Sequence, residues 1–196
     1  MPAPLPDASL EQVFTRARTF GRFTARPVDD DLLRRLYDLA KWGPTSVNGQ
    51  PMRIVFVKSD AARGLLKDAV SSGNVPKVLS APVTAIVAYD TRFFEYLPRL
   101  WHSPGAFERL AGSPAAAEET AFRNSTLQGA YLIVAARMLG LDAGPMSGFD
   151  PVKVNAAFFS DGRWTVNFLV NLGYGDDAGT HPRAERLAFD EAVRVL

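Results

Sequence analysis

The spacing of apolar positions predicts alternating helices and strands along the chain. Helical spacing predicts helices over residues 8–18, 29–42, 61–70, 115–140 and 189–196, and short apolar runs predict strands over 53–58, 83–88 and 166–174. The helix over 115–140 is apolar on nearly every side, so we expect a buried spine of the core that ends at Gly140. A length of 196 residues suits one domain, spanning residues 1–196.

A dense polar turn separates the helix over 29–42 from the strand over 53–58. Its glycines and prolines fix the backbone, while its polar side chains offer hydrogen bonds in several directions. Such a turn either satisfies its own backbone or serves the polar edge of a flat ligand, and the residues alone leave both interpretations open. The polar side chains are Thr45, Ser46, Asn48 and Gln50.

Arginines cluster near the start of the chain. The cluster consists of Arg16, Arg18, Arg22 and Arg26. Such a cluster often forms a solvated basic face. It also suits an anion site, because a guanidinium binds phosphate through paired hydrogen bonds.

The segment over residues 93–107 is rich in aromatic side chains and is interrupted by Pro98 and Pro104. This composition predicts an irregular loop rather than a regular helix or strand. The loop, with His102, either packs as a satellite cluster or forms a lid or channel wall near a substrate.

Residues 44–51 read Pro-Thr-Ser-Val-Asn-Gly-Gln-Pro and resemble the Pro-Ser/Thr-Ser-x-Asn-x-Gln-Pro signature of the nitroreductase family of flavin enzymes. In that family the segment borders the flavin and often reaches the flavin held by the other subunit. Arg18 and Thr19 are similar to part of the family's phosphate motif. Gly21 stands where a basic residue is usual, so Arg16 or Arg22 would replace it.

Two further stretches carry the resemblance. Asn74 and Lys77 keep the family's spacing, which implies contacts of Asn74 with the pyrimidine edge of the flavin and charge stabilisation by Lys77 at N1 and O2. Residues 144–150 resemble the family's Pro-x-x-Gly loop, whose backbone lies over the ring. Ser147 replaces the Glu that many members carry, and Arg123 is a candidate for binding a substrate carboxylate.

The resemblance extends from Arg18 to the last helix and implies an α+β nitroreductase-like fold. A mixed central sheet would be flanked by helices, in an intertwined homodimer with two FMN sites at the interface. The residues that it implies for cofactor binding are Arg16, Arg18, Thr19, Arg22, Pro44, Thr45, Ser46, Asn48, Gln50, Asn74, Lys77, Pro145, Met146, Ser147, Gly148, Arg183 and Arg186.

Composition excludes several other chemistries. The chain has no cysteine, which excludes disulfides, thiolate catalysis and cysteine-ligated metals, and its two histidines lie far apart, so we expect no metal site. A net charge of +1 gives no case for nucleic acid or a membrane surface as a partner. Gly173 and Gly175 form no dinucleotide motif, because no third glycine opens a helix and two acidic residues follow. The first residues lack the pattern of a secretory signal, so we expect a cytoplasmic protein.

An FMN-dependent oxidoreductase that uses NADH or NADPH is therefore the expected function. Residues 41–46, 117–125 and 144–150 resemble most closely the malonic semialdehyde reductase branch of uracil degradation. This resemblance implies reduction of malonic semialdehyde to 3-hydroxypropanoate. The alternatives are a broad nitro- or quinone-reductase and, from another class, a flavin-binding protein without turnover.

Overall fold

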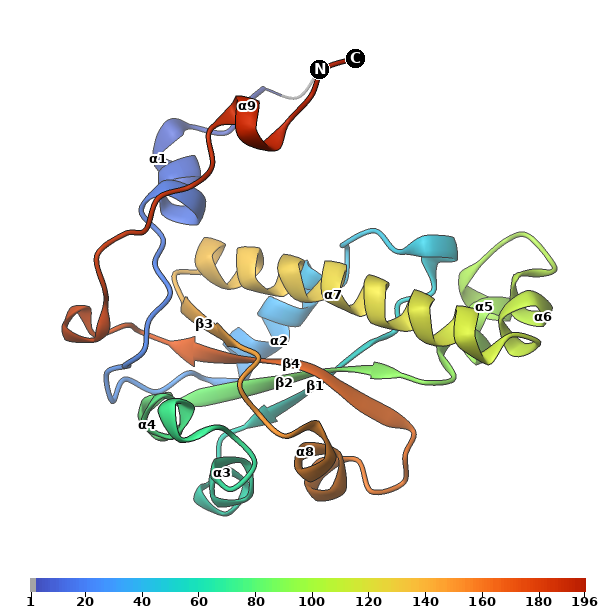
Figure 1. Cartoon of the computed structure of the whole chain (residues 1–196), viewed down its shortest axis with the longest axis horizontal. Helices are drawn as coiled ribbons and strands as arrows, with labels where there is room; N and C mark the ends of the chain where they lie inside the picture. Colours follow the sequence, from blue (N-terminus) through green and yellow to red (C-terminus); the bar gives the residue numbers. More distant parts are fainter. Residues whose placement is uncertain (1–2) are drawn as a thin grey trace.

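The computed structural model describes residues 3–196 and shows a four-stranded sheet between two layers of helices (Figure 1). Helices α2 (Asp30–Ala40) and α7 (Pro114–Met138) cover one face. Helices α3 (Asp60–Lys67), α4 (Val75–Ser80) and α8 (Pro151–Phe158) cover the other face. Each layer buries its own apolar cluster against the strands, and the predicted α+β class is confirmed.

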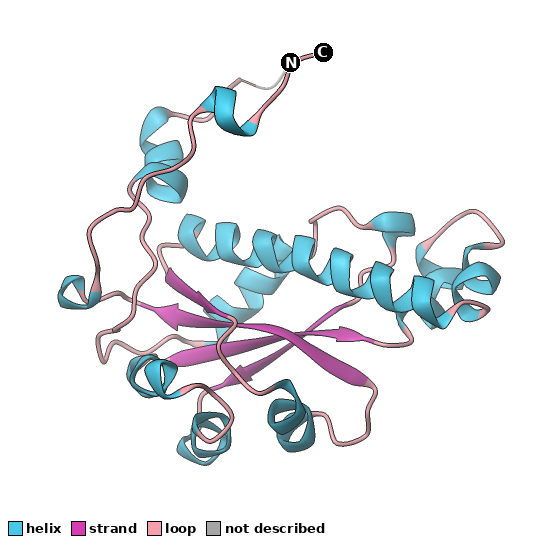
Figure 2. Cartoon of the chain, in the orientation of Figure 1, coloured by secondary structure: helices cyan, strands magenta, loops and turns pink. Residues whose placement is uncertain are grey.

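The strands follow the order β1-β2-β4-β3 across the sheet (Figure 2). Their bounds are Met52–Val57 for β1, Val83–Asp90 for β2, Asp142–Met146 for β3 and Trp164–Gly173 for β4. Each neighbouring pair is antiparallel, so the sheet is antiparallel rather than mixed. The parallel pairing found among residues 3–196 is an isolated bridge between Thr19 and Ala143.

Short helical segments complete the chain between and beyond these elements. They are α1 (Asp7–Leu10), η1 (Glu11–Thr15), η2 (Ser46–Asn48), η3 (Ser72–Asn74), η4 (Phe93–Tyr96), α5 (Leu97–Leu100), α6 (Ala106–Ala111), η5 (Asp177–Gly179) and α9 (Phe189–Ala192). The first predicted helix thus ends at Thr15, and the last helix covers only the first half of its predicted range. In the part of the chain from residue 3 onward, no helix is long and apolar enough to cross a membrane.

Proline explains why several elements were wrong or missing in the sequence-based prediction. The segment over 93–107 was expected to be an irregular loop, but α5 begins beside Pro98. In the same way α4 contains Pro76 in its first turn, and α8 begins at Pro151 with the Asp150 carboxylate as its N-terminal cap. Proline is tolerated in the first turn of a helix because the N–H that it lacks would have no helical partner there.

The long helix α7 is buried on one side only. Leu132 and Ala136 are fully buried against the sheet, as a core spine requires. The prediction of burial nearly all round was wrong for the single chain, because large apolar side chains on the other faces are about half exposed. These are Phe122, Leu127, Tyr131 and Met138.

The first and last described segments, residues 7–17 and 180–192, lie together, away from the sheet. Figure 1 shows α1 and the C-terminal segment with α9 side by side above one end of α7. Arg183 joins them by donating hydrogen bonds from Nη2 to the backbone oxygens of Thr15, at 2.7 Å, and Ala17, at 2.9 Å.

Candidate functional site

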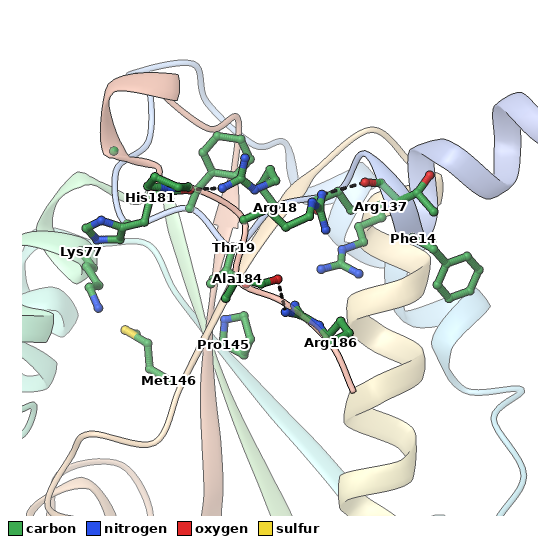
Figure 3. Close-up of a pocket in the computed structure, with 18 residues that line it drawn as sticks. Phe14, Arg18, Thr19, Lys77, Arg137, Pro145, Met146, His181, Ala184 and Arg186 are labelled. Carbon is green, nitrogen blue, oxygen red and sulfur yellow. Dashed lines mark hydrogen bonds between the residues drawn. The ribbon is translucent and has the colours of Figure 1, made fainter. Parts of the chain in front are cut away.

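A cavity of about 570 Å³ lies where the two terminal segments meet β3 and the end of α7 (Figure 3). Residues far apart in the sequence form its walls, because the terminal segments run over the same end of the sheet. The cavity brings together these members of the predicted set: Arg18, Thr19, Lys77, Pro145, Met146, Arg183 and Arg186. Pro145 and Met146 lie in β3 rather than in the loop that the sequence predicted.

The cavity is strongly cationic. Arginine and lysine side chains line it, and none of the described residues in its wall is Asp or Glu. The guanidinium of Arg18 donates to the backbone oxygen of His181, and that of Arg186 donates to Ala184 at 2.9 Å. These guanidiniums bind carbonyl oxygens instead of carboxylates, so their charges are left to an external anion.

Lys77 marks the opposite side of the cavity from the arginines. Figure 3 shows Lys77 and Met146 on one side, Arg137 and Arg186 on the other, and Pro145 between them. The ammonium of Lys77 donates to the Asn74 side-chain oxygen at 3.0 Å. The site therefore has an arginine end and a lysine end.

Asn74 connects Lys77 to the loop after β3. Its side-chain nitrogen donates to the backbone oxygen of Gly148 at 2.9 Å, and the residue is almost fully buried. A Cβ atom at Gly148 would lie 2.6 Å from that nitrogen and 2.7 Å from the Ser71 hydroxyl. Glycine is therefore required at position 148 for this loop to approach Asn74. Ser147 and Gly148 line an adjoining hollow rather than the main cavity.

The polar turn over residues 43–51 lies elsewhere on the molecule. The Ser46 N–H donates to the Asn124 side-chain oxygen at 2.8 Å, and Gly43 packs against the Tyr131 ring. Asn124 and Arg137 are about 20 Å apart along α7, given the rise of a helix per residue. One chain therefore does not bring Pro44, Thr45, Ser46, Asn48 and Gln50 to the cavity.

The turn holds an uncommon backbone. The φ angles of Val47, Asn48 and Gln50 are 49°, 49° and 44°. They lie in the left-handed region, which residues other than glycine rarely adopt. Some of the polar groups satisfy the turn itself, as one sequence interpretation held. The Gln50 N–H donates to the Thr45 hydroxyl at 3.2 Å, and the Gln50 amide nitrogen donates to the Asn48 side-chain oxygen at 3.0 Å. Strained backbone of this kind often marks a binding site.

Three predicted arginines lie outside the cavity. Arg22 pairs with Asp176 at 3.0 Å, and Arg123 pairs with Glu119 on an exposed side of α7. Arg16 is exposed and does not line the cavity wall. Arg22 and Arg123 are each paired with a carboxylate of this chain: the Arg22–Asp176 pair depends on the tertiary fold, whereas the Glu119–Arg123 pair follows from the i,i+4 spacing of the predicted helix.

One cationic side chain of the cavity, that of Arg137, was not predicted from the sequence. Arg137 is in the last turn of α7 and lines the cavity with Arg18, Arg183 and Arg186. A basic residue at a helix C-terminus is expected on electrostatic grounds alone, so its position carried no signal of binding. Among residues 3–196 no cluster of His, Asp and Glu is arranged to hold a metal ion.

Comparison with known proteins shows the family to which the chain belongs. The family model described as the nitroreductase family matches residues 15–174. The chain is 57% identical over 191 residues to a protein of Burkholderia lata, provisionally named NADH dehydrogenase/NAD(P)H nitroreductase, and covers 98% of it with 97% of its own length. A relative of the same provisional name from Rhodopseudomonas palustris is 54% identical, with all of both chains covered. The chain belongs to the nitroreductase family.

Solved structures show the same fold. A provisionally named nitroreductase of Exiguobacterium sibiricum, described in complex with FMN, superposes with a TM-score of 0.83 at 19% identity, and all of both chains is covered. A provisionally named nitroreductase of Bacillus subtilis gives a TM-score of 0.84 at 19% identity, over 97% of this chain and all of that chain.

Proposed function

We propose that this protein is an FMN-dependent oxidoreductase that takes its hydride from NADH or NADPH. The observation that carries the proposal is the cavity with a cluster of guanidiniums at one end and a single lysine at the other. FMN has a phosphate at one end and a ring that gains negative charge on reduction at the other. The names of the relatives and the FMN complex of the structural neighbour support the same cofactor.

The chain's own residues would bind and orient the cofactor. Arg18, Arg183 and Arg186 would hold the phosphate, with the Thr19 hydroxyl as a further donor. When bound, FMN would supply the hydride chemistry that no side chain of the cavity can perform. Met146 would pack against the ring.

Lys77 would stabilise the negative charge at N1 and O2 of the reduced ring. Asn74 fixes the lysine because it accepts the hydrogen bond from Nζ, while its own amide is held by Gly148. A charge that is already positioned costs no reorganisation when the ring becomes reduced. Ser147 would leave more open space beside the ring than the Glu of many family members.

A homodimer would complete the site. Ser46 of the turn contacts Asn124, about 20 Å along α7 from Arg137, and none of the predicted residues of the turn lines the cavity of its own chain, so a second copy would supply them. The outer faces of α2 and α7 and the start of the turn carry the exposed apolar side chains expected of an interface. They are Tyr37, Leu39, Trp42, Phe122, Leu127, Tyr131 and Met138. The terminal segments, which extend away from the sheet in Figure 1, would wrap around the partner.

The resemblance to the malonic semialdehyde reductase branch, carried by residues 41–46, 117–125 and 144–150, favours malonic semialdehyde as the acceptor. Hydride would add to the aldehyde carbon and a proton to its oxygen, which gives 3-hydroxypropanoate and oxidised nicotinamide. The second candidate is a broad reductase of nitro compounds or quinones, and the word nitroreductase in the relatives' provisional names supports its nitro-reductase part. A flavin-binding protein without turnover is the alternative outside the enzyme class.

Anaerobic stopped-flow absorbance separates these functions. The FMN-loaded protein is mixed with NADH or NADPH, and the reduced protein is then mixed with malonic semialdehyde, a nitroaromatic or a quinone. We expect bleaching of the flavin by the nicotinamide and rapid recovery with malonic semialdehyde. Recovery with nitroaromatics or quinones alone would establish the second candidate, and a flavin that no nicotinamide bleaches would contradict an enzymatic role. Failure to bind any flavin would overturn the proposal.

A further inference from the structure

Arg137 differs from the other arginines of the cavity because it lies on a regular element. Arg18, Arg183 and Arg186 belong to irregular segments, whereas Arg137 projects from the last turn of α7. Figure 3 shows its side chain reaching from the helix into the cavity, toward Arg186. The Gln12 side chain donates to the backbone oxygen of Arg137 at 2.7 Å and so fixes this turn further.

The guanidinium of Arg137 is poorly satisfied by the protein. Its Nη1 donates to the backbone oxygen of Val13 at 3.1 Å, and its Nε is buried without a hydrogen-bond partner among residues 3–196. No carboxylate of the described chain forms an ion pair with it. The Arg137 guanidinium therefore stands in the wall of the cavity with one hydrogen bond to the described chain and no carboxylate partner, which leaves its charge to an anion in the cavity.

The charges around Arg137 also favour an anion at this position. Burial lowers the pKa of Arg137, the carboxylate of Asp142 partly offsets that effect, and the positive charge of Arg183 lowers the pKa further. Arg137 and Arg183 therefore repel each other, and an anion bound between them would remove the repulsion.

We propose that Arg137 binds the phosphate of FMN together with Arg18, Arg183 and Arg186, and that it thereby makes the cavity select phosphorylated over unphosphorylated flavin. The inference rests on the proposed cofactor but goes beyond it, because it assigns a recognition role to a residue outside the sequence motifs. A rigid helix presents the guanidinium in place, so little conformational freedom is lost when the phosphate binds.

The alternative role of Arg137 is structural. A cation in the last turn of α7 complements the helix dipole, and its bond to Val13 ties the N-terminal segment to the helix. A purely structural role would affect FMN and riboflavin equally, because both have the same ring and only FMN has the phosphate. The ratio of the two dissociation constants therefore separates the two roles.

Flavin titration of the full chain tests the proposal, with wild type, Arg137→Met and Arg63→Met compared for FMN and riboflavin. Arg63 is a matched control because it is a half-buried arginine outside the cavity. Its Nε is likewise buried without a partner in the described chain, and its Nη2 donates to the backbone oxygens of Lys58 and Pro82, both at 3.0 Å.

We expect Arg137→Met to weaken FMN binding by about 10- to 100-fold, the size of one charge-assisted interaction, while riboflavin binding changes by less than about twofold. Arg63→Met should keep the wild-type ratio of the two affinities. Should the methionine variant not fold, Arg137→Lys, which keeps the charge but loses the forked donors, is expected to shift the ratio in the same direction.

An unchanged ratio in the Arg137 variants, or an equal loss of both flavins, would overturn the inference. A wild-type protein that binds FMN no more tightly than riboflavin would overturn it as well. A wild-type protein that binds neither flavin would instead refute the proposed cofactor, so the two failures are distinguishable.

Discussion

Replacing Lys77 with methionine is expected to lower the turnover number about 100-fold, the loss typical when one preorganised charge is removed from the reacting centre. Methionine keeps much of the side-chain volume but removes the ammonium that Asn74 holds at 3.0 Å. The reduced flavin would lose a stabilising charge, so its midpoint potential should become more negative. Steady-state kinetics and anaerobic redox titration of the FMN-loaded protein measure both effects.

Lys67→Met is the matched control. Lys67 ends α3 and is exposed, outside the wall of the cavity. It should leave both the turnover number and the midpoint potential unchanged. A Lys77→Met protein with wild-type turnover and potential would contradict a role of Lys77 beside the flavin ring.

Asp90→Ala is expected to lower the free energy of unfolding by about 3–5 kcal/mol, as found when one partner of a buried ion pair is removed. The Asp90 carboxylate is only 1% exposed and accepts hydrogen bonds from three sides. Arg163 Nε donates at 2.6 Å, Arg53 Nη2 at 2.8 Å and the Arg92 N–H at 2.9 Å. The alanine variant would leave two half-buried guanidiniums without their common anion. Urea unfolding at a fixed protein concentration measures the loss.

The same network reaches the polar turn. Arg53 Nη1 donates to the backbone oxygens of Gln50 and Met52, both at 2.9 Å, so Asp90 indirectly holds the end of the turn. Asp38→Ala, which removes an exposed pair with Lys41, should leave the unfolding midpoint unchanged. A loss below about 1 kcal/mol for Asp90→Ala would mean that the network behaves like a surface ion pair.

The segments with a clear apolar pattern were predicted correctly from the sequence. The strands over 53–58, 83–88 and 166–174 and the helix over 115–140 lie within two residues of observed elements at their starts, because each is a continuous, largely apolar segment that the core buries. The helices α4, α5 and α8 escaped prediction because each carries a proline near its start, where proline initiates rather than breaks a helix.

The candidate site was predictable only in part. Arg18 donates a hydrogen bond to His181, although the two residues are 163 positions apart in the sequence. No local sequence pattern indicates this contact. Arg22 belongs to the same cluster but pairs with Asp176, and Arg137 was missed because its position on a helix end has an ordinary explanation. Contacts of this kind depend on tertiary structure, which residue spacing does not encode.

The aromatic segment over residues 93–107 agrees with one of its two interpretations, a satellite cluster. Phe93 and Leu97 are buried in a satellite cluster with Tyr89 of β2 and Ala121 of α7, apart from the main core. A role as a lid near a substrate stays a prediction.

The central claim is that one flavin lies between the arginine cavity of one chain and the polar turn of another, and mixed dimers test it most directly. One subunit carries Arg18→Ala and Arg183→Ala, and the other carries Ser46→Trp at an exposed position of the turn. The two subunits bear different purification tags, and each homodimer is first checked for its size. We predict that neither homodimer binds FMN, while the heterodimer binds about half as much as wild type, because one of its two symmetric sites is intact. A heterodimer that binds no FMN would show that both elements act within one chain and would contradict the claim.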